Sequence, residues 1–292
     1  MHSSIEINHN TKIVGVIGHP IKHSLSPMMH NYAFNKANLD FVYLPFDIAP
    51  TNLQDALKGM VALGITGFNV TIPHKERIVE YLDELSDGAK IINAVNTIVN
   101  DNGKLYGYNT DITGIVKTLE DYKDDIAGQT VSVFGAGGAS RAVIYALINT
   151  FLVKKINIIN RTVEKAELLK DYFSSKMLFE KIKTYELIPP DVTTILAKSK
   201  VIINASSIGM SPEEDDAPTT IPESFNEKQI VFDIVYNPRK TKLLSIAESQ
   251  GATVINGLKM FIEQGAEAYE LWTSKKLPTE NITEILEKDV EL

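Results

Sequence analysis

The stretch Thr130-Val-Ser-Val-Phe-Gly135-Ala-Gly137-Gly138-Ala-Ser140-Arg141-Ala142 decides the fold. An apolar, strand-like run leads into clustered glycines, and a helix-forming segment, Ala139–Asn149, follows. A dinucleotide-binding turn has this order because glycine permits the tight bend and lets the backbone approach a pyrophosphate at a helix N-terminus. Gly135 and Gly137 fit those roles, whereas Ser140 stands where glycine or alanine is usual. A plain glycine-rich turn is the alternative, and the flanking strand and helix favour dinucleotide binding.

The end of the next predicted strand, Ile156–Ile159, indicates which dinucleotide is bound. The strand is followed by Asn160, Arg161 and Thr162, with Lys165 one turn further on. A carboxylate at this place would bind a ribose 2′-hydroxyl, whereas arginine accommodates a 2′-phosphate. Two cations and a hydroxyl match a phosphate dianion, which favours NADP, although the nearby Glu164 leaves some NAD use open. The alternative is that Arg161 is a solvated surface charge and Thr162 caps a helix.

Strand-like and helix-like segments alternate on both sides of the glycine-rich turn. Before it come strand-like Lys12–Ile17, Phe41–Phe46 and Gly67–Val70, helix-like Pro27–Ala37 and Asn52–Leu63, and the pair Val95–Val99 and Lys104–Tyr108 around Asn102-Gly103, a hairpin signal. After it come strand-like Ile156–Ile159, Val201–Ile203, Ile230–Ile234 and Thr253–Ile255, and helix-like Glu164–Phe173, Thr241–Ser249 and Leu258–Trp272.

This alternation predicts an α/β protein of two domains. The first is an α/β domain with a mainly parallel sheet, and the second is a Rossmann-like dinucleotide-binding domain. We place the boundary near Asp111–Gly114, and a return crossing near Asn256-Gly257 stays open at this point.

The overall composition limits the classes of partner. The 292 residues carry 29 Lys and Arg against 37 Asp and Glu, a formal net charge of −8, which disfavours nucleic acids and anionic membranes as partners. The absence of cysteine excludes disulfides, thiolate nucleophiles and Cys-ligated metals. Residues 1–11 lack the apolar core of a signal peptide, and the longest apolar stretch, Ala142–Val153, is too short to span a bilayer. We therefore expect a cytoplasmic protein.

Four polar strings lie in the N-terminal half and are candidates for ligand binding. They are Ser24-Leu-Ser26-Pro27, Asn69-Val-Thr71-Ile-Pro-His-Lys75, Ala94-Val-Asn96-Thr97 and Asn109-Thr-Asp111. Ser26 before Pro27 is explained either as a helix N-cap or as a hydroxyl that holds a small anion. Lys75 follows a short buried strand and so lies at the carboxyl edge of the predicted sheet, where α/β proteins bind ligands. The alternative is a solvated surface lysine, which is the commoner case. Lys75 and Asp111 could form a proton-transfer pair if folding brings them together.

The six histidines all lie before residue 75. His19, His23 and His30 raise the alternative of a metal site. Pro20 and Pro27 break any helix that would carry the first two on one face, and the chain has no H-E-x-x-H spacing. We therefore expect no metal site.

These motifs, taken together, closely resemble the shikimate dehydrogenase family. The resemblance runs through nearly the whole chain in the family's order and spacing, and it adds Asn204-Ala-Ser206, Asp233-Ile-Val-Tyr236-Asn-Pro, Asn256-Gly257-Leu258 and Gln264-Gly-Ala to the strings above. It implies that the chain's tail folds back on the first domain. The implied domains are 1–111 with 256–292, which bind substrate, and 112–255, which bind NADP.

The resemblance also implies a role for each matching residue. Lys75 and Asp111 would be the catalytic pair. Substrate would contact Ser24, Ser26, Thr71, Lys75, Asn96, Asp111, Tyr236 and Gln264. NADP would contact Asp87, Gly135, Ala136, Gly137, Gly138, Ala139, Asn160, Arg161, Thr162, Lys165, Ser206, Ile234 and Gly257. Two departures stand out, because Ser206 replaces the commoner threonine and Lys165 replaces an arginine of some members, which removes a bidentate grip but keeps the charge.

The activity that the resemblance implies is the NADPH-dependent, reversible reduction of 3-dehydroshikimate to shikimate in aromatic amino-acid (chorismate) biosynthesis. The expected partners are this small-molecule substrate and NADP, with no nucleic acid, no membrane and no metal, in a monomer or homodimer. Two alternatives stay open: a quinate/shikimate dehydrogenase that uses NAD, and a non-catalytic ligand sensor on the same fold. The retention of Lys75 and Asp111 disfavours the sensor.

Overall fold

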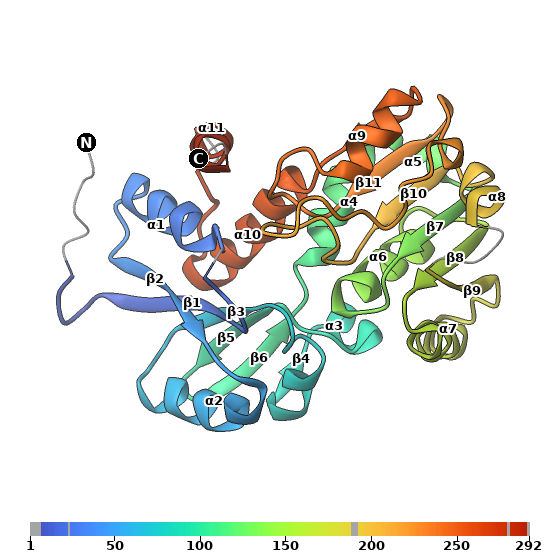
Figure 1. Ribbon diagram of the computed structural model, residues 1–292. Coiled ribbons are helices and arrows are strands. Elements are labelled where there is room, and N and C mark those ends of the chain that lie inside the picture. The colour runs from blue at the N-terminus through green and yellow to red at the C-terminus, as the bar shows by residue number, and fades with distance from the viewer. Residues whose placement is uncertain (1–6, 23, 188–191, 279–280, 291–292) are drawn as a thin grey trace. The chain divides into compact units, whose positions relative to one another are not determined.

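The computed structural model describes residues 7–22, 24–187, 192–278 and 281–290, and it consists of two compact units. Unit 1 combines Met1–Thr113 with Ile262–Leu292, and unit 2 is Gly114–Phe261. The chain passes from one unit to the other within helices α4 (Asp111–Leu119) and α10 (Leu258–Thr273) (Figure 1). Unit 1 is therefore built from both ends of the chain.

The sheet of unit 1 has the strand order β2-β1-β3-β5-β6-β4. Its strands are β1 (Lys12–Gly18), β2 (Phe41–Asp47), β3 (Gly67–Val70), β4 (Glu84–Leu85), β5 (Thr97–Asp101) and β6 (Lys104–Tyr108), and its helices are α1 (Ser26–Lys36), α2 (Leu53–Ala62), α3 (Asp87–Ile92) and α11 (Ile282–Val290). The pairs β1–β2, β1–β3 and β4–β6 are parallel, whereas β3–β5 and β5–β6 are antiparallel. Short 3-10 helices at Pro50–Asn52 and Arg77–Tyr81 complete the connections.

The predicted hairpin in this sheet is confirmed. Strands β5 and β6 pair antiparallel from Thr97 opposite Tyr108 to Asp101 opposite Lys104. The turn residues Asn102 and Gly103 have φ values of 53° and 93°, which asparagine and glycine adopt at little cost. The strand begins two residues later than predicted, because Val95 and Asn96 belong to the loop that bonds to Lys75 and Tyr108.

The tail of the chain packs against the sheet of unit 1 through Trp272 in α10. The indole Nε1 donates to the carbonyl oxygen of Ile98 at 3.0 Å. A Cβ atom at Gly67 would lie 2.3 Å from that Nε1 and 2.5 Å from the same carbonyl. Glycine at the start of β3 therefore lets the helix approach the strand closely.

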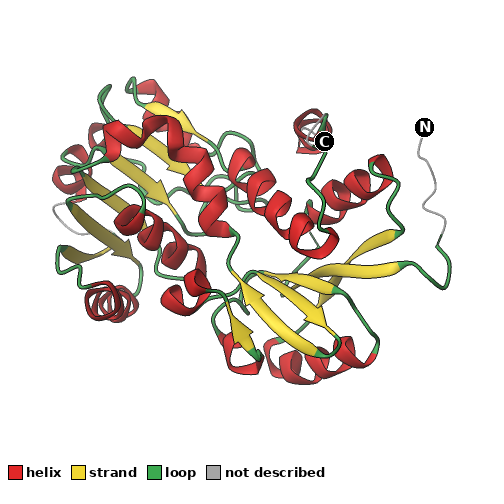
Figure 2. Ribbon diagram, turned by 180° about the vertical axis from the view of Figure 1, so that it is seen from behind, coloured by secondary structure: helices red, strands yellow, loops and turns green. Residues whose placement is uncertain are grey.

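The sheet of unit 2 has the strand order β12-β11-β10-β7-β8-β9, and all its pairs are parallel. Its strands are β7 (Thr130–Phe134), β8 (Lys155–Asn160), β9 (Ile182–Glu186), β10 (Val201–Asn204), β11 (Ile230–Asp233) and β12 (Thr253–Ile255), and its helices are α5 (Lys123–Ile126), α6 (Gly138–Asn149), α7 (Val163–Met177), α8 (Val192–Ala197) and α9 (Lys242–Ser249), with 3-10 turns at Glu120–Tyr122 and Pro222–Ser224. Helices lie on both faces of the sheet (Figure 2). In chain order from β7, this is the 3-2-1-4-5-6 arrangement of the Rossmann fold, as predicted.

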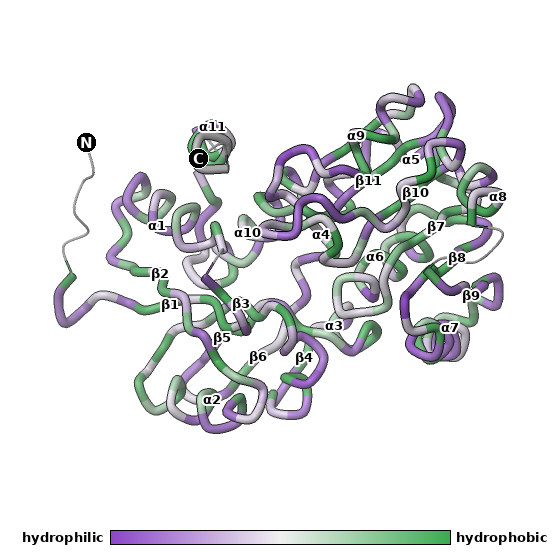
Figure 3. Tube along the Cα trace, in the orientation of Figure 1, coloured by the Kyte–Doolittle hydropathy of each residue, from purple (hydrophilic) through white to green (hydrophobic). Residues whose placement is uncertain are grey.

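Each unit has its own hydrophobic core. In unit 1, side chains of β1, β3 and α2, such as Ile17, Phe68 and Leu57, are buried together, and in unit 2 Phe134 and Leu243 belong to the corresponding cluster. Strands β7 and β8 are largely hydrophobic along their length, whereas α7 is largely hydrophilic (Figure 3). No helix among the described residues is both long and apolar enough to cross a membrane.

A substitution at Gly67 tests the packing of the tail. We expect Gly67→Ala to lower the free energy of unfolding by about 1–3 kcal/mol, since the added methyl overlaps the indole and a backbone carbonyl. Urea unfolding followed by the fluorescence of Trp272, the chain's single tryptophan, measures the change in unit 1.

Gly59→Ala in α2 is the matched control. A Cβ atom there meets nothing within 4 Å, so the helix should gain about 0.5–1 kcal/mol from the lower backbone entropy of the unfolded chain. Equal unfolding midpoints for the two variants would contradict the packing argument.

Candidate functional site

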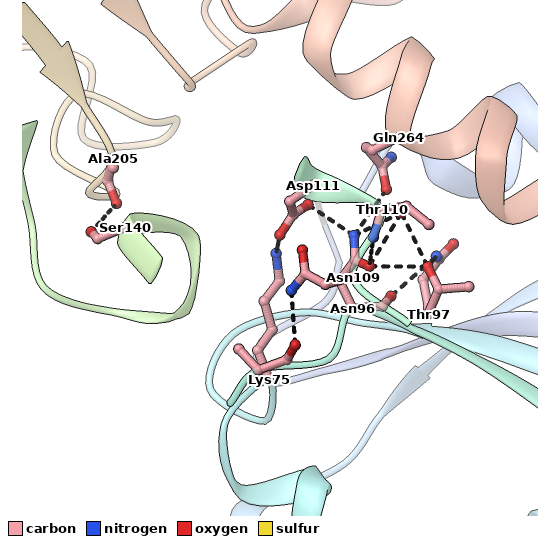
Figure 4. Close-up of polar contacts among 11 residues, drawn as sticks. Lys75, Asn96, Thr97, Asn109, Thr110, Asp111, Ser140, Ala205 and Gln264 are labelled. Atoms are coloured by element: carbon pink, nitrogen blue, oxygen red, sulfur yellow. Dashed lines mark hydrogen bonds and ion pairs between the residues drawn. The ribbon is translucent and has the colours of Figure 1, made fainter. Parts of the chain in front are cut away.

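The structure brings Lys75 and Asp111 together as an ion pair (Figure 4). Lys75 lies in the loop after β3, and Asp111 is the first residue of α4, directly after β6. The Nζ–Oδ2 distance is 2.5 Å, and the side chains are only 15% and 6% exposed. A pair so far removed from water must be well bonded to be stable, because each ion has lost most of its hydration.

The side chain of Asn96 holds the aspartate in place. Its Nδ2 donates to Asp111 Oδ1 at 2.8 Å, to Thr110 Oγ1 at 3.0 Å and, at 3.4 Å, to Gln264 Oε1 on α10. Its Oδ1 accepts from the Thr110 amide at 2.7 Å. The orientation of the amide is therefore determined, and the NH₂ end faces the carboxylate.

Two threonines in this network carried no predicted role. Thr97 Oγ1 donates to Asn96 Oδ1 at 3.1 Å, and it lies 3.2 Å from Thr110 Oγ1. Both threonines are fully buried. They belong to strings that the sequence singled out, but only the pairing of β5 with β6 brings the two hydroxyls together.

Asn69, also in a predicted string, has a structural role. It is 7% exposed, its Oδ1 accepts from the Tyr43 hydroxyl at 2.7 Å, and its Nδ2 donates to Thr97 Oγ1 at 2.9 Å and to the Asn96 carbonyl at 3.2 Å. Its amide thus ties β2, β3 and β5 to one another.

The structure rules out one of the two explanations for Ser26, that it caps the N-terminus of α1. Ser26 was expected as the N-cap with Pro27 at the first helical position, but the helix already begins at Ser26, and Leu25 is the N-cap. The reason is that Leu25 has helical backbone angles, φ −82° and ψ −5°. The hydroxyl of Ser24 instead accepts from the Ser26 amide at 3.3 Å. The capping explanation for Ser26 is therefore wrong.

Thr71 lies at the base of the same loop as Lys75. Its amide donates to the Ile17 carbonyl at 2.9 Å, and its own carbonyl accepts from the His74 amide at 2.9 Å. Its half-buried side chain packs beside Gly18, where a Cβ atom would lie 2.5 Å from Thr71 Cγ2. The end of β1 therefore leaves room for this threonine.

His30 is a core residue of unit 1 and is fully buried. Its ring stacks on Tyr43 with centroids 4.5 Å apart and lies 5.4 Å from Trp272. Burial lowers the pKa of His30 to about 3. His19 pairs with Asp47 on the surface, and His23 lies outside the described residues. Within the described ranges, no three His, Cys, Asp or Glu side chains form a group that could hold a metal ion.

The glycine-rich turn of unit 2 has the shape that the sequence predicted. Gly135 has a φ of +104°, and a Cβ atom there would lie 3.0 Å from the Ala205 carbonyl oxygen. Gly137 meets nothing within 4 Å, so the turn is open there to a ligand, and α6 begins at Gly138. Ser140 is fully buried with its Oγ 3.5 Å from the Ala205 carbonyl oxygen, which explains how a serine fits at the third position (Figure 4).

The end of β8 presents the predicted cations. Arg161 and Lys165 are exposed, and Asn160 Nδ2 donates to the Thr162 carbonyl at 2.8 Å. Thr162 occupies the N-cap position of α7, but its side chain makes no capping bond. Its hydroxyl and the two cations could therefore serve a phosphate.

The remaining predicted cofactor residues divide between the units. Ser206 and Ile234 follow β10 and β11 directly, and Gly257 packs on the Ile234 carbonyl, where a Cβ atom would lie at 2.1 Å. Asp87, by contrast, is an exposed residue of unit 1, at the start of α3. Tyr236, predicted to contact substrate, belongs to unit 2, and its ring centroid lies 4.4 Å from that of Phe261.

Comparison with known proteins decides the family. Residues 16–98 match the family model of a shikimate dehydrogenase substrate binding domain, 117–256 that of shikimate / quinate 5-dehydrogenase, and 257–287 that of a shikimate 5′-dehydrogenase C-terminal domain. The shikimate dehydrogenase (NADP(+)) of Methanocaldococcus jannaschii is 46% identical over 270 residues, 91% of this chain and 93% of the relative. The chain belongs to the shikimate dehydrogenase family.

Solved structures of shikimate dehydrogenases agree with this assignment over the whole chain. One, in complex with NADP+, has a TM-score of 0.89 and 43% identity and covers 98% of both chains. The shikimate 5-dehydrogenase from Listeria monocytogenes, in complex with shikimate and NAD, has a TM-score of 0.85 and 40% identity, with 96% of this chain and 98% of that chain covered. The two-domain fold predicted for the family is confirmed.

The buried His30 makes the stability of unit 1 depend on pH. Its imidazole is neutral in the fold and protonates near pH 6.5 when unfolded, so stability should fall as the pH drops from 6.5 toward 3, by up to about 1.4 kcal/mol per pH unit. We expect His30→Leu to flatten this part of the pH profile in urea unfolding followed by Trp272 fluorescence. The exposed His9 provides the control His9→Gln, which should keep the wild-type slope. An unchanged slope in His30→Leu would contradict the assignment.

Proposed function

We propose that this protein catalyses the NADPH-dependent, reversible reduction of 3-dehydroshikimate to shikimate, with Lys75 and Asp111 as its catalytic residues. The observation that carries the proposal is the buried ion pair between them, held by the Asn96 amide. Membership of the shikimate dehydrogenase family supports the same activity.

Lys75 supplies the proton that the reduction needs. When bound, NADPH supplies the hydride that adds to the carbonyl carbon of the substrate. Negative charge then develops on the carbonyl oxygen, and an ammonium beside it both stabilises that charge and donates the proton. Asp111 accepts a hydrogen bond from Lys75 and so fixes the direction of its Nζ. In the reverse direction, the neutral amine accepts the proton from the shikimate hydroxyl.

Unit 1 is the proposed substrate-binding domain. Ser24 and Ser26 bind the substrate carboxylate, and Tyr236 is a further expected substrate contact. Thr71, Asn96, Asp111 and Gln264 bind the ring hydroxyls, and three of these, Asn96, Asp111 and Gln264, already share one hydrogen-bonded network. A carboxylate and an amide hold hydroxyls well because each offers acceptors in fixed positions.

Unit 2 is the proposed NADP-binding domain. The segment 135–139 receives the pyrophosphate at the N-terminus of α6. Gly137 has no side chain, and the space beside it is open, so the backbone there is accessible to the phosphates. Asn160, Arg161, Thr162 and Lys165 hold the adenosine 2′-phosphate. Ser206, Ile234 and Gly257 contact the rest of the cofactor, and Asp87 is a further expected cofactor contact.

The expected protein is a cytoplasmic monomer or homodimer that binds neither nucleic acids nor membranes. The net charge of −8 supports this expectation. The runner-up function is a quinate/shikimate dehydrogenase that uses NAD. Cations rather than a carboxylate at the end of β8 disfavour it.

Lys75→Ala tests the proton-transfer role. We expect kcat to fall by about 10²–10⁴-fold with little change in KM for shikimate, because the ammonium acts mainly on charge that develops in the transition state. Initial rates of NADPH formation at 340 nm give both constants. Lys58→Ala, on the exposed face of α2, is the control and should retain wild-type rates. A Lys75→Ala enzyme with near-normal kcat would remove this lysine from the chemistry.

Arg161→Ala tests the choice of cofactor. Loss of a charge-assisted bond to the 2′-phosphate should raise KM for NADP about 10–100-fold and leave KM for NAD nearly unchanged. Rates with shikimate and quinate, each with NADP and NAD, separate the proposed activity from its runner-up. Lys165→Arg is the matched variant with the opposite expected effect. The planar guanidinium of arginine can form two hydrogen bonds to a phosphate, so this variant should lower KM for NADP. Equal loss with both cofactors would contradict the phosphate assignment.

A further inference from the structure

Asp233, the last residue of β11, is a fully buried carboxylate in unit 2. Three groups donate to it: the Asn204 side-chain amide at 2.9 Å, the Val235 backbone amide at 3.0 Å and the Thr241 hydroxyl at 2.7 Å. All three donors are uncharged. Burial raises the pKa of Asp233 to about 6, although these hydrogen bonds oppose the shift. Among the described residues no cation is bonded to this carboxylate, so its burial is costly and its retention needs a reason.

The three donors come from three separate segments of unit 2. Asn204 ends β10, Val235 lies in the loop after β11, and Thr241 is the N-cap of α9, where its hydroxyl also accepts from the Leu244 amide at 3.3 Å. One carboxylate therefore fastens two neighbouring strand ends and the start of a helix to one another. All three segments meet at the carboxyl edge of the sheet, where open α/β sheets bind their ligands.

Asn204 carries the effect of this carboxylate to the loop after β10. Asp233 and the Ile208 carbonyl, at 2.9 and 3.1 Å, both accept from Asn204 Nδ2, so the amide can face only one way. Its Oδ1 then accepts from the backbone amide and the hydroxyl of Ser206, at 3.1 and 2.6 Å. The position of Ser206 thus depends on the carboxylate through one intermediate side chain.

The strand order says which half of a dinucleotide this edge serves. A Rossmann sheet consists of two mononucleotide-binding halves on either side of the first strand, here β7. The cations Arg161 and Lys165 follow β8 and assign the β7–β9 half to the adenosine 2′-phosphate. The half formed by β10 and β11 is left for the nicotinamide mononucleotide.

We propose that Asp233 is a positioning residue for the nicotinamide half of NADP. It holds the loops after β10 and β11 in the conformation that receives the nicotinamide, and it does so through Asn204, Val235 and Thr241 without touching the cofactor. This inference rests on the proposed function and adds to it a residue with no assigned role.

The test compares the binding of whole NADP with the binding of its adenosine half. In Asp233→Asn, an NH₂ group replaces one carboxylate oxygen, so one of the buried donors loses its acceptor. We expect the Kd for NADP to rise about tenfold, while the Kd for 2′,5′-ADP stays within about twofold of wild type. Isothermal titration calorimetry with NADP and with 2′,5′-ADP measures both constants without any need for turnover.

Gln229→Glu is the matched control at the opposite end of β11. Gln229 is 2% exposed, its Nε2 donates to the carbonyls of Leu196 and Ser199, and its Oε1 accepts from the Asn226 amide. The exchange of amide and carboxylate there disturbs an equally buried network at the amino edge. It should lower the thermal midpoint of unfolding and leave both Kd values unchanged.

Thr241→Val is a second, milder variant that removes one donor without a change in size. We expect it to raise the Kd for NADP about threefold, again with unchanged binding of 2′,5′-ADP. Equal rises for NADP and 2′,5′-ADP in Asp233→Asn, or no rise in either, would overturn the positioning role and leave the proposed function standing. A wild-type protein that binds neither NADP nor 2′,5′-ADP would overturn the proposed function as well.

Discussion

A lysine ammonium and an aspartate carboxylate that are both almost out of contact with water impose conditions on everything around them. The Lys75–Asp111 pair, at 15% and 6% exposure, is stabilised by a second hydrogen bond to the carboxylate, which the Asn96 amide donates to Asp111 Oδ1. Asn96 thus lies beside Asp111, with Thr97 and Thr110 bonded to Asn96 and the amide of Asn69 bonded to Thr97. The close pairing of β3, β5 and β6 in unit 1 is what brings these groups within reach of one another.

Each unit contains a buried aspartate, and the two aspartates have different kinds of partner. In unit 1, the carboxylate of Asp111 is paired with the ammonium of Lys75. In unit 2, the donors to Asp233 from the described residues are an amide side chain, a backbone amide and a hydroxyl, all of them uncharged. The first arrangement keeps a charged donor beside a charged acceptor, whereas the second fixes the positions of the segments that carry the neutral donors. A buried aspartate is therefore informative about function only when its partners are known.

Much of this architecture could be predicted from the sequence, for reasons visible in particular residues. Turn chemistry is local, so Asn102-Gly103 predicted its hairpin, and the glycines at 135 and 137 predicted the turn before α6. Apolar runs likewise predicted β3, β7 and β12 with their observed bounds. Strand β9 was not predicted, because Lys183 and Glu186 interrupt its apolar character and only its pairing with β8 makes it a strand.

The candidate site could be predicted only in part, because local sequence patterns do not show which residues far apart in the chain will be in contact. The strings that contain Lys75 and Asp111 were visible, but their 2.5 Å contact depends on how β3 and β6 are placed in one sheet. The three bonds to Asp233 join residues up to 29 positions apart, and no spacing rule indicates them. The capping explanation for Ser26 was wrong for a local reason, since the helix begins at Ser26 itself and Leu25 is its N-cap.

The interrupted order of unit 1 along the chain has a consequence for how the protein is made. Synthesis runs from the N-terminus, so all of unit 2 is available to fold while unit 1 still lacks α10 and α11. Until Trp272 has been made, Gly67 and the carbonyl of Ile98 lack their contact with its indole, and before Gln264 has been made the network around Asn96 lacks its side chain. The hydrogen-bonded network around Lys75 and Asp111 is therefore complete only after Gln264 has been made, although Lys75 and Asp111 themselves come before the whole of unit 2.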